Sequence, residues 1–328
     1  MIIKQRETTL IIEKLQALLR RLPTNHTMFA EVESELSRRL AGMTGENSLD
    51  YPLSFLHAEE YHLFHGLRLF HDPYFFQIDT LIVTRKFLLV SEVKTFSGSL
   101  YFDQNAQQLV RTRKDGTIDI FSDPIIQVKR QKSLLEAWLV RNHLQRIPVI
   151  PYVVLSNPLT SISSNLEPSV LSQIVIHRDA LPDRISHLSK TFNDECSPTT
   201  LVKLTETLQL KHTPLDPVIL SRFKLTTSDL KKGVLCPSCS YSPVTRIYGS
   251  WHCPKCSTKS KDAHVAALRD YALLVETHIT NREARAYLKL ESESLTKRIL
   301  NKIGGRTEGA TKGRIYDLSH FRREGEVR

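Results

Sequence analysis

The sequence predicts a mixed α/β core in which helices flank a central sheet, followed by a small cysteine-containing module and a helical tail. Over residues 30–210, short β-rich runs alternate with segments of helical periodicity. Further along, four of the five cysteines form two Cys-x-x-Cys pairs, and segments of helical spacing follow them. We therefore expect an N-terminal helix in residues 1–28, the α/β domain in 29–221, the cysteine module in 222–260 and the tail in 261–328.

Composition places the chain among ordinary globular proteins. It has 328 residues, of which 41% are hydrophobic and 24% are charged, and a chain of this length forms roughly two or three domains. The N-terminus, Met1–Glu7, carries no apolar segment with a cleavage site, and no run of about 18 apolar residues occurs that could span a membrane. We expect a cytoplasmic protein without a membrane partner.

Positive charge is concentrated in the last third of the chain. Residues 1–221 contain 24 basic and 24 acidic side chains, whereas residues 222–328 contain 21 basic and 11 acidic ones. The C-terminal third therefore carries the whole net charge of +10. Such an excess indicates a polyanionic partner such as nucleic acid, although a solvated basic surface would have the same composition.

Apolar residues at helical spacing predict the first helices. They recur from Thr8 to Arg21 and again from about Phe29 to Leu40. We expect a third helix to begin at Thr44, whose hydroxyl is a suitable N-cap. Its apolar stripe would consist of Leu49, Leu53 and Leu56.

The period then changes to that of β-strands. Two short apolar runs, 75–83 and 87–93, are separated by only three residues and predict a pair of adjacent strands. The other expected elements are strands at 98–102 and 108–112 on one edge of the sheet, a long helix starting at Asp123 and Pro124, and buried strands at 148–155 and 173–177.

Charged side chains interrupt both runs of the expected strand pair. Asp79 lies among apolar residues of the first run, and Glu92 and Lys94 end the second. Alternation places Glu92 and Lys94 on the face of Leu88 and Val90, and Asp79 on the face of Phe75 and Leu81, so both faces should be packed.

Burying these charges costs several kcal/mol unless they are paired or bind a cation. Carboxylate oxygens suit Mg²⁺ or Mn²⁺, which hold phosphate oxygens and lower the pKa of a bound water, and a neighbouring lysine can orient that water. An ordinary salt bridge at the end of the sheet is the alternative explanation, and the spacing of these three residues does not exclude it.

Further motifs in the same order carry a family resemblance. They are Gly45-Glu46, Phe76-Gln-Ile-Asp-Thr-Leu81, Glu92-Val-Lys94 with Gly98, Asp123-Pro124 and Gln127-Val-Lys-Arg-Gln131. The set, which spans residues 44–140, resembles the nuclease-related domain (NERD) family of the PD-(D/E)xK nuclease superfamily. The resemblance implies a restriction-endonuclease-like fold and Mg²⁺-dependent cleavage of DNA. One departure is that Ile78, not proline, precedes the aspartate.

The resemblance also implies roles for five residues. Asp79 and Glu92 would bind Mg²⁺ or Mn²⁺, Lys94 would activate the attacking water, and Glu46 would be an acid near the metal. Gln127 would support the site or contact DNA. Glu46 and Gln127 are equally compatible with exposed positions on helix surfaces, where such residues usually lie.

The two Cys-x-x-Cys pairs predict a zinc ribbon. Cys236 and Cys239 are separated from Cys253 and Cys256 by thirteen residues, and each pair can present two thiolates to one tetrahedral Zn²⁺. A redox dithiol is the alternative for a single pair, but two pairs at this spacing favour one structural zinc. The ribbon is compatible with phosphate contacts as well as with a structural or protein-binding role.

The tail resembles a winged helix-turn-helix. A helix at 262–277 is followed by one that Asn281 would cap and another at Ser292–Lys302, and then by a glycine-rich basic segment and the strand-like 315–318. Helix 292–302 would enter the major groove of DNA, and the residues near DNA would be Thr296, Lys297 and Arg298 on this helix and Lys312 and Arg314 on the wing. A small helical packing domain is the alternative.

Together these features predict a metal-dependent DNA nuclease whose C-terminal modules bind the substrate. A non-catalytic DNA-binding or regulatory protein that keeps the nuclease fold is the alternative, and a protein–protein scaffold is a third option. RNA as the substrate, the preferred DNA structure and the oligomeric state stay open.

Overall fold

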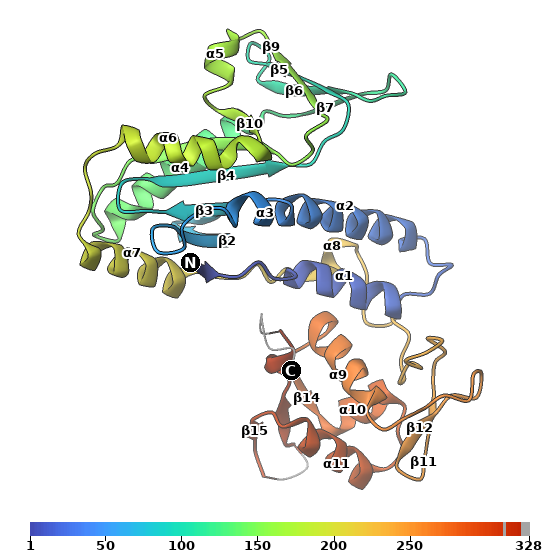
Figure 1. The fold of residues 1–328 in the computed structure, drawn as a ribbon. Helices are drawn as coiled ribbons and strands as arrows, with labels where there is room; N and C mark the ends of the chain where they lie inside the picture. The colour runs from blue at the N-terminus through green and yellow to red at the C-terminus, as the bar shows by residue number, and fades with distance from the viewer. Residues whose placement is uncertain (311–312, 323–328) are drawn as a thin grey trace. The chain divides into compact units, whose positions relative to one another are not determined.

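The computed structural model describes residues 1–310 and 313–322, which form two compact units (Figure 1). Met1–Arg6 and Leu40–Pro214 form the first unit, and Glu7–Arg39 and the described part of Leu215–Arg328 form the second. Both units are therefore discontinuous in sequence, whereas the sequence suggests four consecutive segments. Within the described residues, no helix is both long and apolar enough to cross a membrane.

The first unit is a mixed α/β structure. Its strands are β1 Ile2–Lys4, β2 His62–His71, β3 Tyr74–Val83, β4 Leu88–Lys94, β5 Ser99–Asp103, β6 Gln108–Thr112, β7 Ile118–Ser122, β8 Val149–Leu155, β9 Ser161–Ser164 and β10 Val175–His177. Its helices are α3 Asp50–Leu53, α4 Pro124–Arg141, α5 Pro168–Leu171, α6 Leu181–Thr191 and α7 Pro198–Lys211, with the 3₁₀ helix η1 Arg178–Ala180. Helix α2, Phe29–Asn47, contributes residues to both units.

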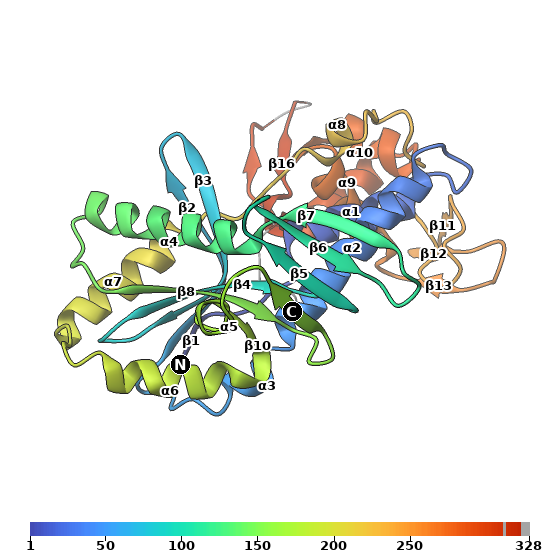
Figure 2. The ribbon, with the colours of Figure 1, turned by 90° about the horizontal axis from the view of Figure 1, so that it is seen from above.

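A six-stranded sheet in the order β1-β2-β3-β4-β8-β10 is the centre of this unit. Strands β2, β3 and β4 are antiparallel neighbours, whereas β4, β8 and β10 run parallel. Figure 2 shows α4 and α6 on opposite sides of these strands. The expected mixed sheet with flanking helices is confirmed, as is the adjacent pairing of the two strands that carry the charged residues.

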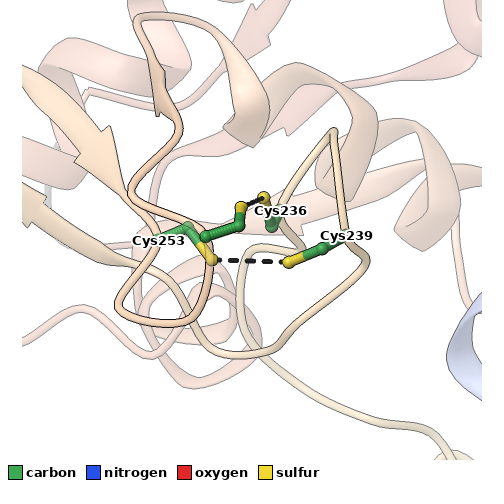
Figure 3. Close-up of side chains that lie close together, drawn as sticks. Cys236, Cys239 and Cys253 are labelled. Atoms are coloured by element: carbon green, nitrogen blue, oxygen red, sulfur yellow. Dashed lines mark hydrogen bonds between the residues drawn. The ribbon is translucent and has the colours of Figure 1, made fainter.

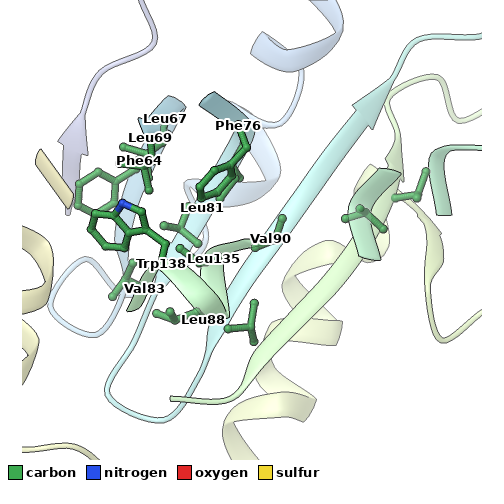
Figure 4. Packing of buried hydrophobic residues seen from close by; sticks show 14 of the residues in the cluster. Phe64, Leu67, Leu69, Phe76, Leu81, Val83, Leu88, Val90, Leu135 and Trp138 are labelled. Atoms are coloured by element: carbon green, nitrogen blue, oxygen red, sulfur yellow. The ribbon is translucent and has the colours of Figure 1, made fainter. Parts of the chain in front are cut away.

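Alternation along the strands divides the apolar core into two layers. One layer joins the sheet to α4 and α7 and includes Leu81, Leu88 and Val90. Figure 4 shows Leu135 and Trp138 of α4 packing in this layer. The opposite layer joins the sheet to α3 and α6 through Ile82, Leu89, Leu53 and Ile185, among others.

Two expectations for this unit are wrong, and one strand was not expected at all. Strands β5 and β6 do not extend the central sheet but form a second sheet in the order β7-β6-β5-β9. Thr44 does not begin a new helix, because α2 continues through it and its hydroxyl donates to the Leu40 carbonyl within the same helix. Strand β2 was not expected from the sequence, although it is the direct neighbour of β3.

The second unit combines helices with two small sheets. Its helices are α1 Leu10–Arg21, α8 Ile219–Arg222, α9 Ala263–Leu274, α10 Asn281–Leu288, α11 Glu293–Ile303 and the 3₁₀ helix η2 Ser319–Arg322. Strands β11 Thr245–Ile247, β12 Ser250–His252 and β13 Lys259–Ser260 form one sheet, and β14 His278–Thr280, β15 Thr307–Glu308 and β16 Ile315–Asp317 form the other.

The C-terminal segment is not all-helical, since three strands surround α10 and α11 in the order β14-β16-β15. Thr280, not Asn281, caps α10, because its side chain accepts from Glu283 N–H in a capping box. Ser292 caps α11 as expected, accepting from Leu295 N–H. Helix α1 packs on α9, so the N-terminal helix belongs to the same compact unit as the tail.

Candidate active site and metal centre

The site begins where β3 and β4 separate. Their pairing runs from Val83 and Leu88 to Thr80 and Ser91. Beyond that pair, the Val93 N–H has a side-chain acceptor in place of a backbone carbonyl of β3. The acceptor is Asp79 Oδ2, at 2.9 Å. This bond fixes Asp79 beside the end of β4, where Glu92 and Lys94 lie.

Strand β3 changes its buried face at Asp79. Phe76 and Ile78 are buried before it, and Leu81 and Val83 are buried after it, so the alternation shifts by one residue. In the register of β2 and β3, Gly66 lies opposite Asp79 and has a φ of +60°, a conformation that favours glycine. The expectation that Phe75 packs on the face of Asp79 is therefore wrong, and its side chain is 41% exposed.

The side chains that end β4 are held by each other and by α4. Lys94 Nζ donates to Glu92 Oε1 at 2.6 Å and to Gln127 Oε1 at 3.1 Å. Gln131, one turn further along α4, donates its Nε2 to Glu92 Oε2 at 2.7 Å. The N-cap Asp123 accepts the Ile125 N–H at 2.8 Å and so fixes the start of the helix that presents both glutamines.

Glu46 reaches the same region because a glycine precedes it. A Cβ on Gly45 would lie 1.7 Å from Thr95 Oγ1, so only glycine lets α2 approach the segment that follows β4 this closely. Arg6 Nη1 then donates to Glu46 Oε2 at 3.1 Å, and its Nη2 lies 2.8 Å from His65 Nδ1. The five residues expected at the site are thus brought to one end of the sheet.

Like charges crowd this end of the sheet. Burial raises the pKa of Asp79 well above its usual range, and repulsion from Glu92 and Glu46 raises it further, against the opposing effects of Val93 N–H and Lys94. Burial also raises the pKa of Glu46, opposed by Arg6 and reinforced by Glu92. A bound cation would relieve the repulsion among these carboxylates.

The donor set fits a hard divalent cation. Among the described residues, only the four zinc-ribbon cysteines place three or more metal-ligating atoms within 4.8 Å of one another, so the carboxylates are more widely spaced than in an all-protein cage. Mg²⁺ keeps several waters and uses one or two carboxylates. Asp79 and Glu92 could hold it, and Glu46 lies close enough to both for its charge to act on them.

Sequence reasoning did not assign roles to Gln131 and Arg6. Gln131 lies four residues after Gln127 and hence on the same face of α4, which is a signal that was available. Arg6 is remote in sequence from Glu46 and is brought to it by the parallel pairing of β1 with β2. That pairing depends on a three-residue strand, so nothing local in the sequence indicates it.

The four cysteines Cys236, Cys239, Cys253 and Cys256 form a second candidate metal centre. Figure 3 labels the first three of them. Cys236 Sγ lies 3.5 Å from Cys256 Sγ, and Cys239 Sγ lies 3.6 Å from Cys253 Sγ. Tetrahedral Zn²⁺ with Zn–S bonds of about 2.3 Å separates its sulfurs by about 3.8 Å. The cluster is therefore compatible with a zinc ribbon.

The two cysteine loops have the same backbone structure. Cys236 N–H donates to Tyr241 O at 2.8 Å, and Cys253 N–H donates to Thr258 O at 3.0 Å. Each loop returns through a serine of positive φ, 56° at Ser240 and 58° at Ser257. This turn brings both sulfurs of a pair to one side of the backbone, which is the arrangement that a single ion requires.

Packing around Trp251 supports the ribbon. Its indole N–H donates to His264 Nδ1 at 3.1 Å, and burial lowers the pKa of His264 to about 4, so the ring stays neutral and accepts this bond at neutral pH. The Arg246 guanidinium lies over the Trp251 ring at 5.0 Å. Arg246 is thus engaged in packing against the ribbon, and its Nη2 also donates to Gly249 O at 2.9 Å.

The residues of the tail that were expected to contact DNA differ in their exposure to solvent. Thr296 is fully buried and donates its hydroxyl to Ser292 O at 3.0 Å, so it is unavailable for a DNA contact. Lys297 and Arg298 are exposed on α11. Arg314 is half-buried and donates to Gly309 O, and Lys312 lies outside the described residues.

Comparison with known families matches residues 41–156 to NERD, the nuclease-related domain. The matched segment contains all five residues of the site expected from the sequence, from Glu46 to Gln127. The resemblance drawn from the motifs is confirmed for this segment, which covers part of the first unit. No curated protein and no solved structure matches the chain.

Proposed function

We propose that the first unit is a divalent-metal-dependent nuclease of the PD-(D/E)xK type and that the protein processes DNA. The observation that carries the proposal is the meeting of Asp79, Glu92, Lys94 and Glu46 at one end of the sheet. A stable core would not need Glu92 and Glu46 placed where they raise the pKa of Asp79, whereas metal-dependent phosphodiester hydrolysis uses a cation held by carboxylates beside a lysine.

Asp79 and Glu92 are the proposed metal ligands. The bound cation would supply a Lewis acid for a phosphate oxygen and would acidify a water. The Asp79 carboxylate is oriented for this by Val93 N–H, and Gln131 orients the carboxylate of Glu92. Hydrolysis would form a bond from the water oxygen to phosphorus and break a phosphorus–oxygen ester bond; one proton of the water would end on the leaving alcohol oxygen, and the other would stay on the product phosphate or pass to solvent.

Lys94 is the proposed partner of the attacking water and of the developing phosphate charge. Its ammonium group is held between Glu92 and Gln127, so its position is fixed before substrate binds. Gln127 is therefore a positioning residue, because it acts through Lys94. Glu46, paired with Arg6, would accept bonds from water near the cation.

The second unit is the proposed DNA-binding part. Its order of elements, α9-β14-α10-α11-β15-β16 with a β14-β16-β15 sheet, supports the proposal because it resembles a winged helix-turn-helix. Lys297 and Arg298 on α11 would contact DNA, with Arg314 shaping the β15–β16 segment. The zinc ribbon in this unit would be structural.

The test is cleavage of plasmid, linear duplex and single-stranded DNA and RNA by the full chain with Mg²⁺ or Mn²⁺, and with EDTA. We expect Asp79→Asn and Lys94→Met each to reduce the cleavage rate at least about a hundredfold. The matched controls are Asp183→Asn and Lys190→Met, two exposed residues of α6 on the other side of the sheet, which should keep the full rate.

Cleavage that survives both site substitutions would assign the activity to another protein in the preparation. Binding of DNA without metal-dependent cleavage under any of these conditions would favour the non-catalytic DNA-binding alternative.

A further inference from the structure

A groove of about 530 Å³ lies between the β2–β3 hairpin and helix α4. One wall is the turn end of the β2–β3 hairpin, including Tyr74, and the other is α4, including Arg130. Gln127 and Gln131 line the groove as well, and these two side chains contact Lys94 and Glu92. The groove therefore lies beside the proposed site of hydrolysis, and these two glutamines are shared by both.

Tyr74 presents an open aromatic ring to this groove. Its side chain is 77% exposed, and within the described residues no ring or cation stacks on it. Phe75, the next residue, is different, because the Arg68 guanidinium covers its ring at 3.7 Å and Phe70 lies 5.0 Å away. Of these neighbouring aromatic rings, Tyr74 is the one left open to a ligand.

Among the described residues, the facing wall, on α4, carries one unpaired positive charge, that of Arg130. Helix α4 carries four basic residues and one acidic residue, Glu136, which pairs with Lys132 at 3.8 Å. Arg130 is exposed, and none of the described residues forms a hydrogen bond or ion pair with it. The acidic residue on the hairpin side, Asp72, is paired with Arg141 at 3.3 Å, so its charge is offset.

We propose that this groove binds an unpaired nucleotide next to the scissile phosphate, its base stacked on Tyr74 and its phosphate held by Arg130. The proposal rests on the proposed nuclease function and specifies its substrate class as nucleic acid with a single-stranded segment. The flat face of a base is accessible for stacking only when the base leaves the duplex stack. The volume also lies in the range that accommodates a ligand of nucleotide size rather than a duplex.

The experiment compares binding with cleavage in the full chain. Fluorescence anisotropy in EDTA measures the affinity for a labelled single-stranded oligonucleotide, a blunt duplex of the same sequence, and a duplex with a single-stranded flap, in DNA and RNA versions. Tyr74→Ala should weaken binding of the single strand by roughly tenfold and leave the blunt duplex unchanged, because alanine offers no ring on which a base can stack. Tyr74→Phe should keep the affinity.

Matched controls separate this surface from the rest of the unit. Tyr51→Ala removes a ring that is 73% exposed on α3 and does not line the groove, so it should have no effect. Arg130→Gln should reduce the salt slope of single-strand binding by about 0.7, whereas Lys129→Gln, exposed on α4 outside the groove, should not.

The outcomes distinguish the two proposals. Loss of single-strand binding in Tyr74→Ala supports the groove assignment, whether or not the protein cleaves. If the wild type does not cleave, that result contradicts the proposed nuclease function but not the groove assignment. Unchanged single-strand binding in Tyr74→Ala, beside cleavage that depends on Asp79, overturns the groove assignment and leaves the nuclease intact. Equal losses in Tyr74→Ala and Tyr74→Phe would also overturn it, since the hydroxyl rather than stacking would then be responsible.

Discussion

The ionised Asp79 lowers the stability of the fold, although its side chain is held in one position by a hydrogen bond. Its carboxylate is fixed by Val93 N–H, yet burial and two nearby carboxylates oppose its ionisation. A raised pKa means that the folded state favours the protonated form, so the contribution to stability is greatest below the unfolded pKa and is lost as the pH rises through the folded pKa. At neutral pH the ionised group therefore lowers the stability of the metal-free protein.

Asp79→Asn should for this reason stabilise the metal-free protein while abolishing cleavage. The asparagine Oδ1 can still accept from Val93 N–H, and the like-charge repulsion is removed. We expect a gain of about 0.5–2 kcal/mol at pH 7.5 in the free energy of unfolding, measured by urea denaturation in EDTA. The gain should shrink at pH 4, and a loss of stability at pH 7.5 would contradict this account of the site.

For His65 the dependence of stability on pH is opposite to that of Asp79. Burial lowers its pKa to about 3, and Arg6 and Lys4 add to the effect, so the folded protein holds the ring neutral. Its stabilising contribution is present above the unfolded pKa and is lost as the pH falls toward the folded pKa. The ring is 3% exposed, so solvent screening is small.

Acidification from pH 7.5 to pH 5 should therefore cost about 2 kcal/mol more in the wild type than in His65→Gln. Denaturation curves at the two pH values measure the difference. His187→Gln, an exposed histidine of α6, is the control and should follow the wild type.

At the scale of elements, helix α2 is placed by a close contact. Gly45 touches Thr95, and a Cβ there would also lie 3.1 Å from Ser156 Oγ. The hydroxyls of Thr95 and Ser156 are bonded to each other at 3.0 Å, so neither moves without loss of that bond. The position of Glu46 depends on this contact.

Gly45→Ala should move the end of α2 away from Thr95 and so increase the distance between Glu46 and the other two carboxylates, Asp79 and Glu92. We expect cleavage to fall at least about tenfold and stability to fall by about 1–3 kcal/mol from overpacking. Gly42→Ala is the control on the same helix, because its added Cβ meets nothing within 4 Å and alanine favours a helix. Equal rates in the two variants would show that the contact does not position Glu46.

We expect the cysteine module to depend on a bound metal, because its strands β11–β13 are only two or three residues long and four cysteines meet beside them. The two tryptophans of the chain, Trp138 and Trp251, lie in different units, so fluorescence can report on the ribbon separately. In a Trp138→Phe background, zinc chelation should shift the emission of Trp251 to the red as its buried indole becomes exposed. Elemental analysis should find one zinc per chain, and Cys253→Ser should lose it.

At the scale of the whole molecule, the C-terminal part of the chain packs against the first helix, α1. Helix α1 packs with α9, and Arg21 bonds to Asp270 at 2.7 Å between two buried side chains. Removing residues 222–328 would therefore expose the apolar face of α1 as well as delete charge. A loss of DNA affinity in that deletion would not identify the surface responsible.

Charge substitution is the better test of the tail. Lys297→Gln with Arg298→Gln should weaken binding to duplex DNA and reduce its salt slope by about 0.9 for each phosphate that is no longer neutralised. Lys203→Gln, an exposed residue of α7, is the control. The measurement is duplex affinity at several salt concentrations, and an unchanged slope would remove α11 from the DNA-binding surface.

The sequence by itself determined the features that depend on local spacing. Strand and helix periods predicted the mixed sheet, the β3–β4 pair and helix α4, and the two cysteine pairs predicted a cluster of four sulfurs. Asp79, Glu92 and Lys94 stood out because charged groups at apolar strand positions need a partner. The motif order added Glu46 and Gln127.

Only the tertiary structure decided the features that depend on contacts between segments far apart in the chain. Gln131 and Arg6 join the site through α4 and through the pairing of β1 with β2, and the buried face of β3 shifts at Asp79 opposite Gly66. Thr296 points into the core although its neighbours are exposed. These outcomes depend on contacts between residues far apart in the chain, and the local periodicity of a sequence contains no information about such contacts.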